Sequence, residues 1–140
     1  MAEVTIKWLE KKRFVGTDST RHGIVIAGSD PEEGGIGVKP SDMLLLALGS
    51  CTAYDVVNIL EKKRTGLSDL EVQVTAEQEP DPPWTFASFH VHFVLTGKNL
   101  TPKAVEDAIK LSDEKYCCVA ATLRLGVPVT HGFEIINEDD

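Results

Sequence analysis

Two cysteines in distant parts of the chain are the residues best suited to chemistry. Cys51 lies in the middle of an apolar segment, and Cys117 and Cys118 are adjacent much later in the sequence. A cysteine in apolar surroundings is ordinarily a small, unreactive side chain. The neighbours of Cys51 favour a reactive thiol, because they are small or polar and let another segment or a ligand approach: Gly49, Ser50 and Thr52.

A polar streak follows Cys51 along the same predicted helix. Asp55 and Asn58 lie four and seven residues after Cys51, which places all three on one face of a helix. Buried polar groups need hydrogen-bond partners. We therefore expect this face to contact other polar groups rather than to pack against apolar side chains of the core.

The histidines offer a second, weaker possibility. His90 and His92 are two residues apart, so they share one face of a strand, and such pairs can bind zinc. A complete site needs a third or fourth ligand, and neither the Cys117-Cys118 pair nor His131 is spaced to supply one. We therefore predict no metal site, and a histidine pair on the sheet face opposite the apolar side chains. The fourth histidine is His22.

The sequence also lacks the common motifs of other chemistries. It contains no GxGxxG pattern, no Walker loop, no GxSxG pattern and no CxxC pair. The candidates for chemistry are the three cysteines and the histidines.

The N-terminal third must be built from strands. Residues 4–8 alternate between apolar and polar types, and residues 22–27 form a β-branched run that ends in a turn-rich segment. An antiparallel meander fits this pattern best. A helix over residues 41–64 follows, because Pro40 and Asp42 suit a helix N-terminus, while Lys62-Lys63-Arg64 and then Gly66 suit its end.

The rest of the chain predicts a mixed α+β fold. Residues 70–76 and 87–95 alternate and should form an antiparallel pair. Thr101 and Pro102 open a second helix that breaks near Ser112 and Asp113. A short helix over residues 119–123 and a strand over residues 128–136 complete the order. Strands and helices do not alternate regularly, so the fold class is α+β, in one domain over residues 1–140.

Composition excludes several classes of protein. The chain has 140 residues, of which 42% are hydrophobic and 26% charged, and its formal net charge is −8. A negative chain does not attract nucleic acid or an anionic membrane surface, so neither partner is expected. The odd count of three cysteines and an N-terminus unlike a signal peptide predict free thiols in the cytoplasm.

The long helix predicts a homodimer. In residues 43–60, 13 of 18 residues are apolar, and Met43 to Leu48 are all apolar, so hydrophobic side chains cover every face. Gly49, Ser50, Asp55 and Asn58 argue against a membrane span. A chain of this size has little material to bury such a helix on all sides, and a second copy is the expected cover. Burial within one subunit is the alternative.

Two segments carry a resemblance to a known family. Residues 40–60, PSDMLLLALGSCTAYDVVNIL, and residues 111–119, LSDEKYCCV, resemble the OsmC/Ohr family of osmotically inducible and organic hydroperoxide resistance proteins. The order and separation of the two motifs also match, and the OsmC-like branch is the most similar. The resemblance implies an OsmC-like fold: an intertwined α+β homodimer with the long helices at its centre and active sites at the subunit interface.

The same resemblance implies a thiol-dependent reduction of organic hydroperoxides without metal or flavin. Cys51 matches the cysteine that attacks the peroxide, and Cys117 matches the cysteine that resolves the sulfenic acid. An external dithiol would reduce the resulting disulfide. Cys118 stands where relatives usually carry a proline or a small residue, and no role is assigned to it.

A cation beside Cys51 is the remaining requirement. An arginine about 4 Å from the sulfur would lower its pKa enough to form thiolate at neutral pH. In the peroxidase branch of the family, a carboxylate near the start of the long helix holds such an arginine. Here Asp42 stands close to that position, one residue later in the sequence. Asp42 and Cys51 are about 13.5 Å apart along a helix axis, so Asp42 would act only through a bridging arginine. Arg13 and Arg21 are the candidates, with an ordinary surface role as the alternative for each.

Three functions remain open at this point. The first is a peroxidase with an apolar substrate pocket lined by Leu44, Leu48 and Phe14 and by the partner subunit. The second is a thiol-bearing binding or carrier protein that holds a small molecule without turnover. The third is a structural dimer with inert cysteines.

Overall fold

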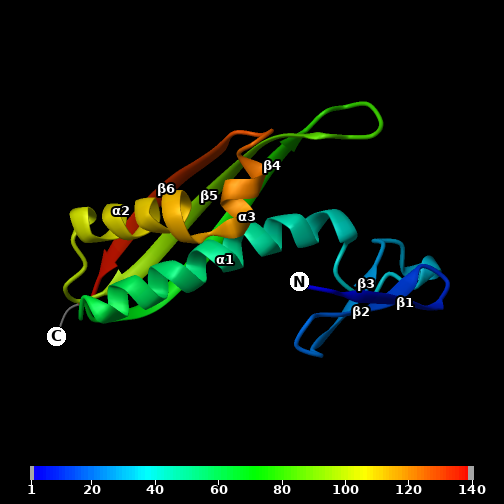
Figure 1. Cartoon of the computed structure of the whole chain (residues 1–140), viewed down its shortest axis with the longest axis horizontal. Helices are drawn as coiled ribbons and strands as arrows, with labels where there is room; N and C mark the ends of the chain where they lie inside the picture. Colours follow the sequence, from blue (N-terminus) through cyan, green and yellow to red (C-terminus); the bar gives the residue numbers. More distant parts are fainter. Residues whose placement is uncertain (1, 139–140) are drawn as a thin grey trace. The chain divides into compact units, whose positions relative to one another are not determined.

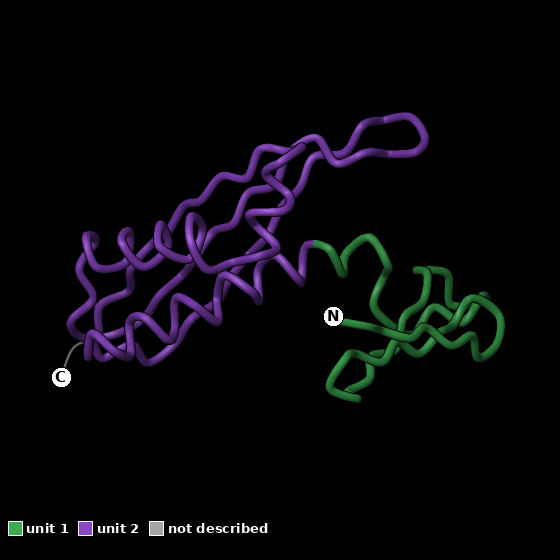
Figure 2. Tube along the Cα trace, viewed as in Figure 1, with its two compact units in different colours: residues 1–44 green, residues 45–140 purple. Residues whose placement is uncertain are grey.

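The computed structural model describes residues 2–138 and divides the chain into two compact units, residues 1–44 and 45–140 (Figure 2). The predicted strands and helices occur in the predicted order, with one further strand and short helical turns between some of them (Figure 1). The α+β class is therefore confirmed, while the single domain stays a prediction.

The first unit contains the predicted antiparallel meander. It consists of β1 (Thr5–Glu10), β2 (Arg13–Thr17) and β3 (Gly23–Ala27), with β2 in the centre. The sequence did not single out β2, whose five residues are too few to show a clear alternation. A short 3-10 turn, η1 (Pro31–Glu33), follows, and the Asp30 side chain caps it by accepting a hydrogen bond from the Glu32 amide.

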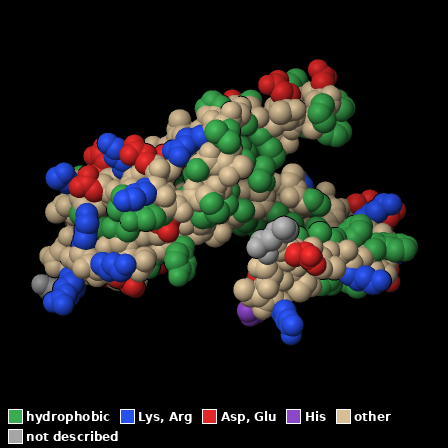
Figure 3. Space-filling view, in the orientation of Figure 1, with side chains coloured by type: hydrophobic (Ala, Val, Ile, Leu, Met, Phe, Trp, Pro, Cys, Tyr) green, Lys and Arg blue, Asp and Glu red, His purple; other side chains and the backbone are tan. Residues whose placement is uncertain are grey.

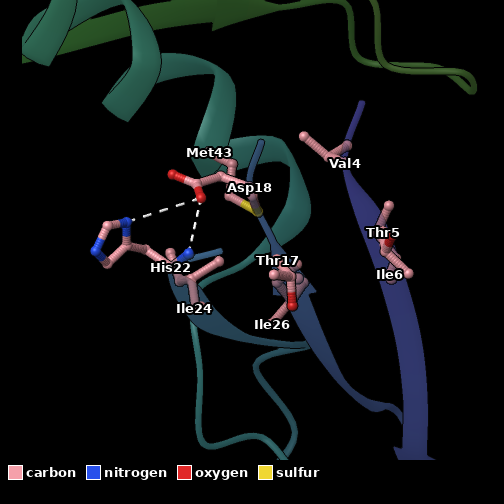
Figure 4. A pocket seen from close by; sticks show the side chains of 11 residues that line it. Val4, Thr5, Ile6, Thr17, Asp18, His22, Ile24, Ile26 and Met43 are labelled. Carbon is pink, nitrogen blue, oxygen red and sulfur yellow. Dashed lines mark hydrogen bonds and ion pairs between the residues drawn. The ribbon is translucent and has the colours of Figure 1, made fainter. Parts of the chain in front are cut away.

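One face of this meander carries a hollow of about 290 Å³. In Figure 4, it is lined by Val4, just before β1, by Ile6 of β1, by Ile24 and Ile26 of β3 and by Met43. Asp18 and His22 stand at its rim, where the His22 amide donates to Asp18 at 2.8 Å. This hydrogen bond, with that of the Thr20 hydroxyl, lowers the pKa of Asp18. Most of the surface inside the hollow is apolar.

The long helix, α1 (Pro40–Lys62), begins in the first unit and continues into the second. Its bounds lie within two residues of the predicted ones. Gly66, which follows the helix, has a φ of 69°, a left-handed conformation that glycine adopts without strain. Along the second unit, one face of α1 enters the core through Leu48, Gly49, Thr52, Val56 and Leu60.

The sheet of the second unit is mixed. The strands β4 (Leu67–Gln78) and β5 (Phe86–Gly97) pair antiparallel as predicted, and β6 (Val129–Asn137) pairs with β5 in parallel. The central position of β5 explains its strong alternation, because the side chains on its inner face are almost fully buried: Phe89, Val91, Phe93 and Leu95. The sequence predicts β6 but not its direction.

The helices of the second unit lie against this inner face. The helix α2 (Pro102–Leu111) begins as predicted, with the Thr101 hydroxyl accepting a hydrogen bond from the Ala104 amide at 3.1 Å. The predicted break at Ser112 is a π-helical turn, η2 (Ser112–Tyr116), and the short helix α3 (Cys118–Leu123) follows. Leu48, Val56 and Leu60 of α1 join Val105 and Ala108 of α2 in one core cluster with β5.

Many large apolar side chains remain on the surface (Figure 3). On β1, Ile6 is 60% and Trp8 62% exposed, and on α1, Leu46 is 54% and Tyr54 75% exposed. Among residues 2–138, α1 is the one helix long and apolar enough to cross a membrane by length and composition, a test that core helices of soluble proteins also pass. A single chain therefore leaves part of α1 uncovered.

Candidate thiol site

The fold brings Cys51 and Cys117 together. Cys51 projects from the middle of α1, and Cys117 stands at the junction of η2 and α3. The two thiols lie within hydrogen-bonding distance of each other. Both are free thiols; Cys117 is only 2% exposed, whereas Cys51 is half-buried. The adjacent Cys118 is also free and is exposed to solvent.

Backbone hydrogen bonds hold Cys117 in place. Its amide donates to the carbonyl oxygen of Ser112 at 2.8 Å and closes the π-helical turn. Its sulfur accepts a hydrogen bond from the Ala120 amide at 3.3 Å and so caps α3. Cys117 is therefore the last residue of one turn and the cap of the next helix, which leaves its sulfur little freedom.

The surroundings keep Cys117 protonated. Burial raises the pKa of this thiol from its ordinary value of 9.0 to about 12, and the hydrogen bond with Cys51 acts in the same direction. The Ala120 and Val119 amides oppose this shift, but burial is the larger effect. At neutral pH Cys117 thus keeps its proton and is a hydrogen-bond donor toward Cys51, so the two cysteines are not equivalent.

The polar streak on α1 meets a polar partner, as the sequence predicts. The Ser112 hydroxyl donates to the Asp55 carboxylate at 2.8 Å, which joins α1 to the start of η2. Ser112 is fully buried. A hollow of about 550 Å³ lies beside this contact and mixes polar and apolar side chains: Asp55, Asn58, Ile59, Lys62, Lys63, Leu111 and Tyr116.

A second polar cluster near Cys117 was not predicted. Arg124 donates through one guanidinium nitrogen to the Asp113 carboxylate and through another to the Asp113 carbonyl oxygen. His131 of β6 lies 3.4 Å from the same carboxylate. Burial lowers the pKa of His131, and Arg124 and His90 add to this effect against the opposing charge of Asp113. The cluster ties η2 to the end of α3 and to β6. These residues are too far apart in the sequence for any spacing rule to join them.

The remaining predicted site residues belong to the first unit or to the core. Arg13 on β2 pairs with Glu10 at 3.3 Å, and Arg21 is exposed in the turn before β3. Asp42 is exposed in the first turn of α1. Their roles beside Cys51 stay predictions.

The three residues predicted to line a substrate pocket have different surroundings. Phe14 is half-buried on β2, and Leu44 is 36% exposed on α1. Leu48 is fully buried in the core cluster of the second unit. A shared pocket for them also stays a prediction.

Comparison with known proteins identifies the family. The model of the OsmC-like protein family matches residues 31–132, which include both cysteine segments. The chain belongs to the OsmC-like family. This OsmC-like chain is 38% identical to protein YhfA of Escherichia coli (strain K12) over 134 residues, which cover 96% of this chain and 98% of YhfA.

Solved structures show the same OsmC-like fold. A hypothetical protein from Aquifex aeolicus matches with a TM-score of 0.86 and 27% identity, over 99% of this chain and 98% of that one. The organic hydroperoxide resistance protein OhrB of Bacillus subtilis matches with a TM-score of 0.63 and 16% identity, over 96% and 98% of the two chains. At 16% identity, the match with OhrB shows only that the two proteins share a fold.

Proposed function

We propose that this OsmC-like protein is a two-cysteine peroxidase that reduces organic hydroperoxides to alcohols. The observation that supports it best is the pair of hydrogen-bonded thiols, one on α1 and one at the start of α3. Membership of the family supports the assignment. The name of OhrB, a protein of the same fold, records resistance to organic hydroperoxides and suggests the oxidant.

The proposed cycle has three balanced steps. The Cys51 thiolate attacks the terminal oxygen of ROOH, the O–O bond breaks, and the alkoxide takes a proton to leave as ROH with Cys51 oxidised to the sulfenic acid. The Cys117 sulfur then attacks the sulfenic sulfur, forming a disulfide and releasing water. An external dithiol reduces this disulfide, is itself oxidised to a disulfide, and restores both thiols.

The different surroundings of the two cysteines support this division of roles. Cys51 is half-buried and so is open to a small molecule, whereas Cys117 is buried and protonated. A protonated Cys117 donates its hydrogen bond to the Cys51 sulfur. Since the thiolate is the nucleophile and Cys117 keeps its proton, we assign the attack on the peroxide to Cys51.

The proposal includes a homodimer in the cytoplasm. The exposed apolar side chains of α1 in the second unit, among them Leu46 and Tyr54, leave a surface that a second copy would cover, and in the first unit Trp8 of β1 is exposed as well. An arginine from the same or the partner subunit, Arg13 or Arg21, would stand beside Cys51 with Asp42 as its support. Leu44, Leu48 and Phe14 would line the apolar substrate pocket together with the partner. A reducing compartment keeps the three thiols free.

Peroxide consumption by cysteine variants tests the proposal. Wild-type protein with dithiothreitol should consume cumene hydroperoxide, and Cys51→Ser should lose this activity. Cys117→Ser should accumulate a sulfenic acid on Cys51, which a dimedone adduct detected by mass spectrometry would report. Cys118→Ser is the matched control and should keep turnover. Undiminished turnover in Cys51→Ser, or none in the wild type, would overturn the assignment.

A further inference from the structure

The outer face of the second sheet carries two histidines whose rings lie side by side. Pairing across β4, β5 and β6 places polar side chains on the face opposite the helices, with His90 and His92 on the central strand. Their rings are nearly parallel, with centroids 6.3 Å apart and planes inclined by 24°. The thiol site is on the inner face, so this cluster is independent of it.

A glycine leaves the space between the two rings open. Gly132 of β6 is paired with His92. A Cβ added at Gly132 would stand 3.2 Å from Nδ1 of His92 and 3.3 Å from Nε2 of His90. One nitrogen of each imidazole therefore borders the space above the Gly132 backbone, and no side chain of residue 132 fills it.

The other nitrogen of each ring faces an oxygen. Nδ1 of His90 lies 2.7 Å from the Thr130 hydroxyl, which in turn is 3.5 Å from the Phe89 carbonyl oxygen. If Thr130 donates to that carbonyl, His90 donates through Nδ1 and leaves a lone pair on Nε2. Nε2 of His92 lies 3.7 Å from the Glu134 carboxylate, which favours a proton there and a lone pair on Nδ1. Such oxygen partners orient histidines that bind metals.

We propose that His90 and His92 bind a divalent late transition-metal ion, of the nickel, copper and zinc class, above Gly132. Imidazole nitrogen suits these ions, and a metal–nitrogen distance of about 2.1 Å requires both rings to turn until their nitrogens face one shared position outside the Gly132 backbone. Glu71 and Glu134, which flank Val94 on the neighbouring strands, add negative charge on the same face.

The ion would have two protein ligands and open positions. Within the described residues 2–138, no three side chains of histidine, cysteine, aspartate or glutamate gather into a metal-binding group. Water or an added ligand would therefore complete the coordination, and the bound ion would exchange readily. The prediction of a plain histidine pair is correct about the face they occupy, but it could not include Gly132, which comes from another strand.

Calorimetric titration of Ni²⁺ into the untagged, reduced full chain tests the proposal. We expect one ion per chain, and His90→Gln and His92→Gln should each weaken binding by at least about 10-fold. Gly132→Ala keeps both histidines and fills the space between them, so it should weaken binding to a similar degree. Its backbone φ is not in the left-handed region, and the atoms it meets belong to side chains that can move.

Controls separate this site from other ligands for nickel. His22→Gln removes an exposed histidine of the first unit, whose side chain is 84% exposed, and should leave the affinity unchanged. Circular dichroism spectra should match the wild type for every variant compared. Equal Ni²⁺ affinity in the double variant His90→Gln/His92→Gln would assign binding to the cysteines or to another group and overturn the proposal. Wild-type affinity in Gly132→Ala, or no binding by the wild type, would do the same.

Discussion

The reactivity of Cys117 toward an alkylating reagent is the most direct test of the thiol site. Iodoacetamide reacts with thiolate, so the rate depends on the fraction of each cysteine that is ionised. Because the pKa of Cys117 is raised from 9.0 to about 12, its thiolate fraction at pH 7 is smaller by a factor of about 1000. Burial of the sulfur slows the reaction further, whereas Cys118 is exposed.

The assay is peptide mapping of native protein labelled at pH values from 6 to 10. We expect Cys117 to label at least about 1000-fold more slowly than Cys118 at pH 7, and its rate to rise about tenfold per pH unit without a plateau. Separate Cys117→Ser and Cys118→Ser variants distinguish the neighbouring positions. Labelling in urea is the control, because unfolding should equalise the two rates. A plateau for Cys117 below pH 10, or a rate within tenfold of that of Cys118, would refute the reasoning.

Three further predictions concern the contacts around this site. Above pH 9 the unfolded chain loses the Cys117 proton, whereas the folded chain keeps it up to about pH 12. The contribution of Cys117 to the free energy of unfolding should therefore be constant below pH 9 and fall between pH 9 and about 12. Urea titrations should show a smaller fall for Cys117→Ala. Ser112→Ala removes the 2.8 Å hydrogen bond to Asp55 and should cost about 1 to 3 kcal/mol in urea unfolding, with little further loss when Asp55→Asn is added. Gly49→Ala would place a Cβ 2.7 Å from Val74 Cγ2 and should lower thermal stability, because the steric cost of about 1 to 3 kcal/mol outweighs the helix preference of alanine. Adding Val74→Ala should relieve this cost. Equal stability of Gly49→Ala with and without that second change would contradict this packing.

Local signals account for most of the predicted elements. Thr101 caps α2 as expected because a cap depends on residues within a few positions of each other. The alternation of β5 is visible in the sequence because the central strand buries one whole face. The short β2 and the parallel direction of β6 were not predicted, since five residues show little pattern and strand direction depends on the connection through α2 and α3.

The candidate site was only partly accessible to the same reasoning. Cys51, Cys117 and the polar character of Asp55 follow from local sequence and from the family motifs. The contacts of Ser112 with Asp55, and of Asp113 with Arg124 and His131, join residues from different elements. No periodicity connects such residues, because their proximity is a property of the folded chain.

Cys117 couples the oxidation of the thiol pair to the stability of α3, the short helix that it caps. The sulfur that would form a bond to Cys51 is also the acceptor that begins α3, a helix of only six residues. A sulfur that turns toward α1 leaves the Ala120 amide without its acceptor, and a helix this short has few other bonds to preserve it. Hydrogen exchange at that amide would therefore report the oxidation state of the protein, and frayed residues there would present Cys118 more openly to a reductant.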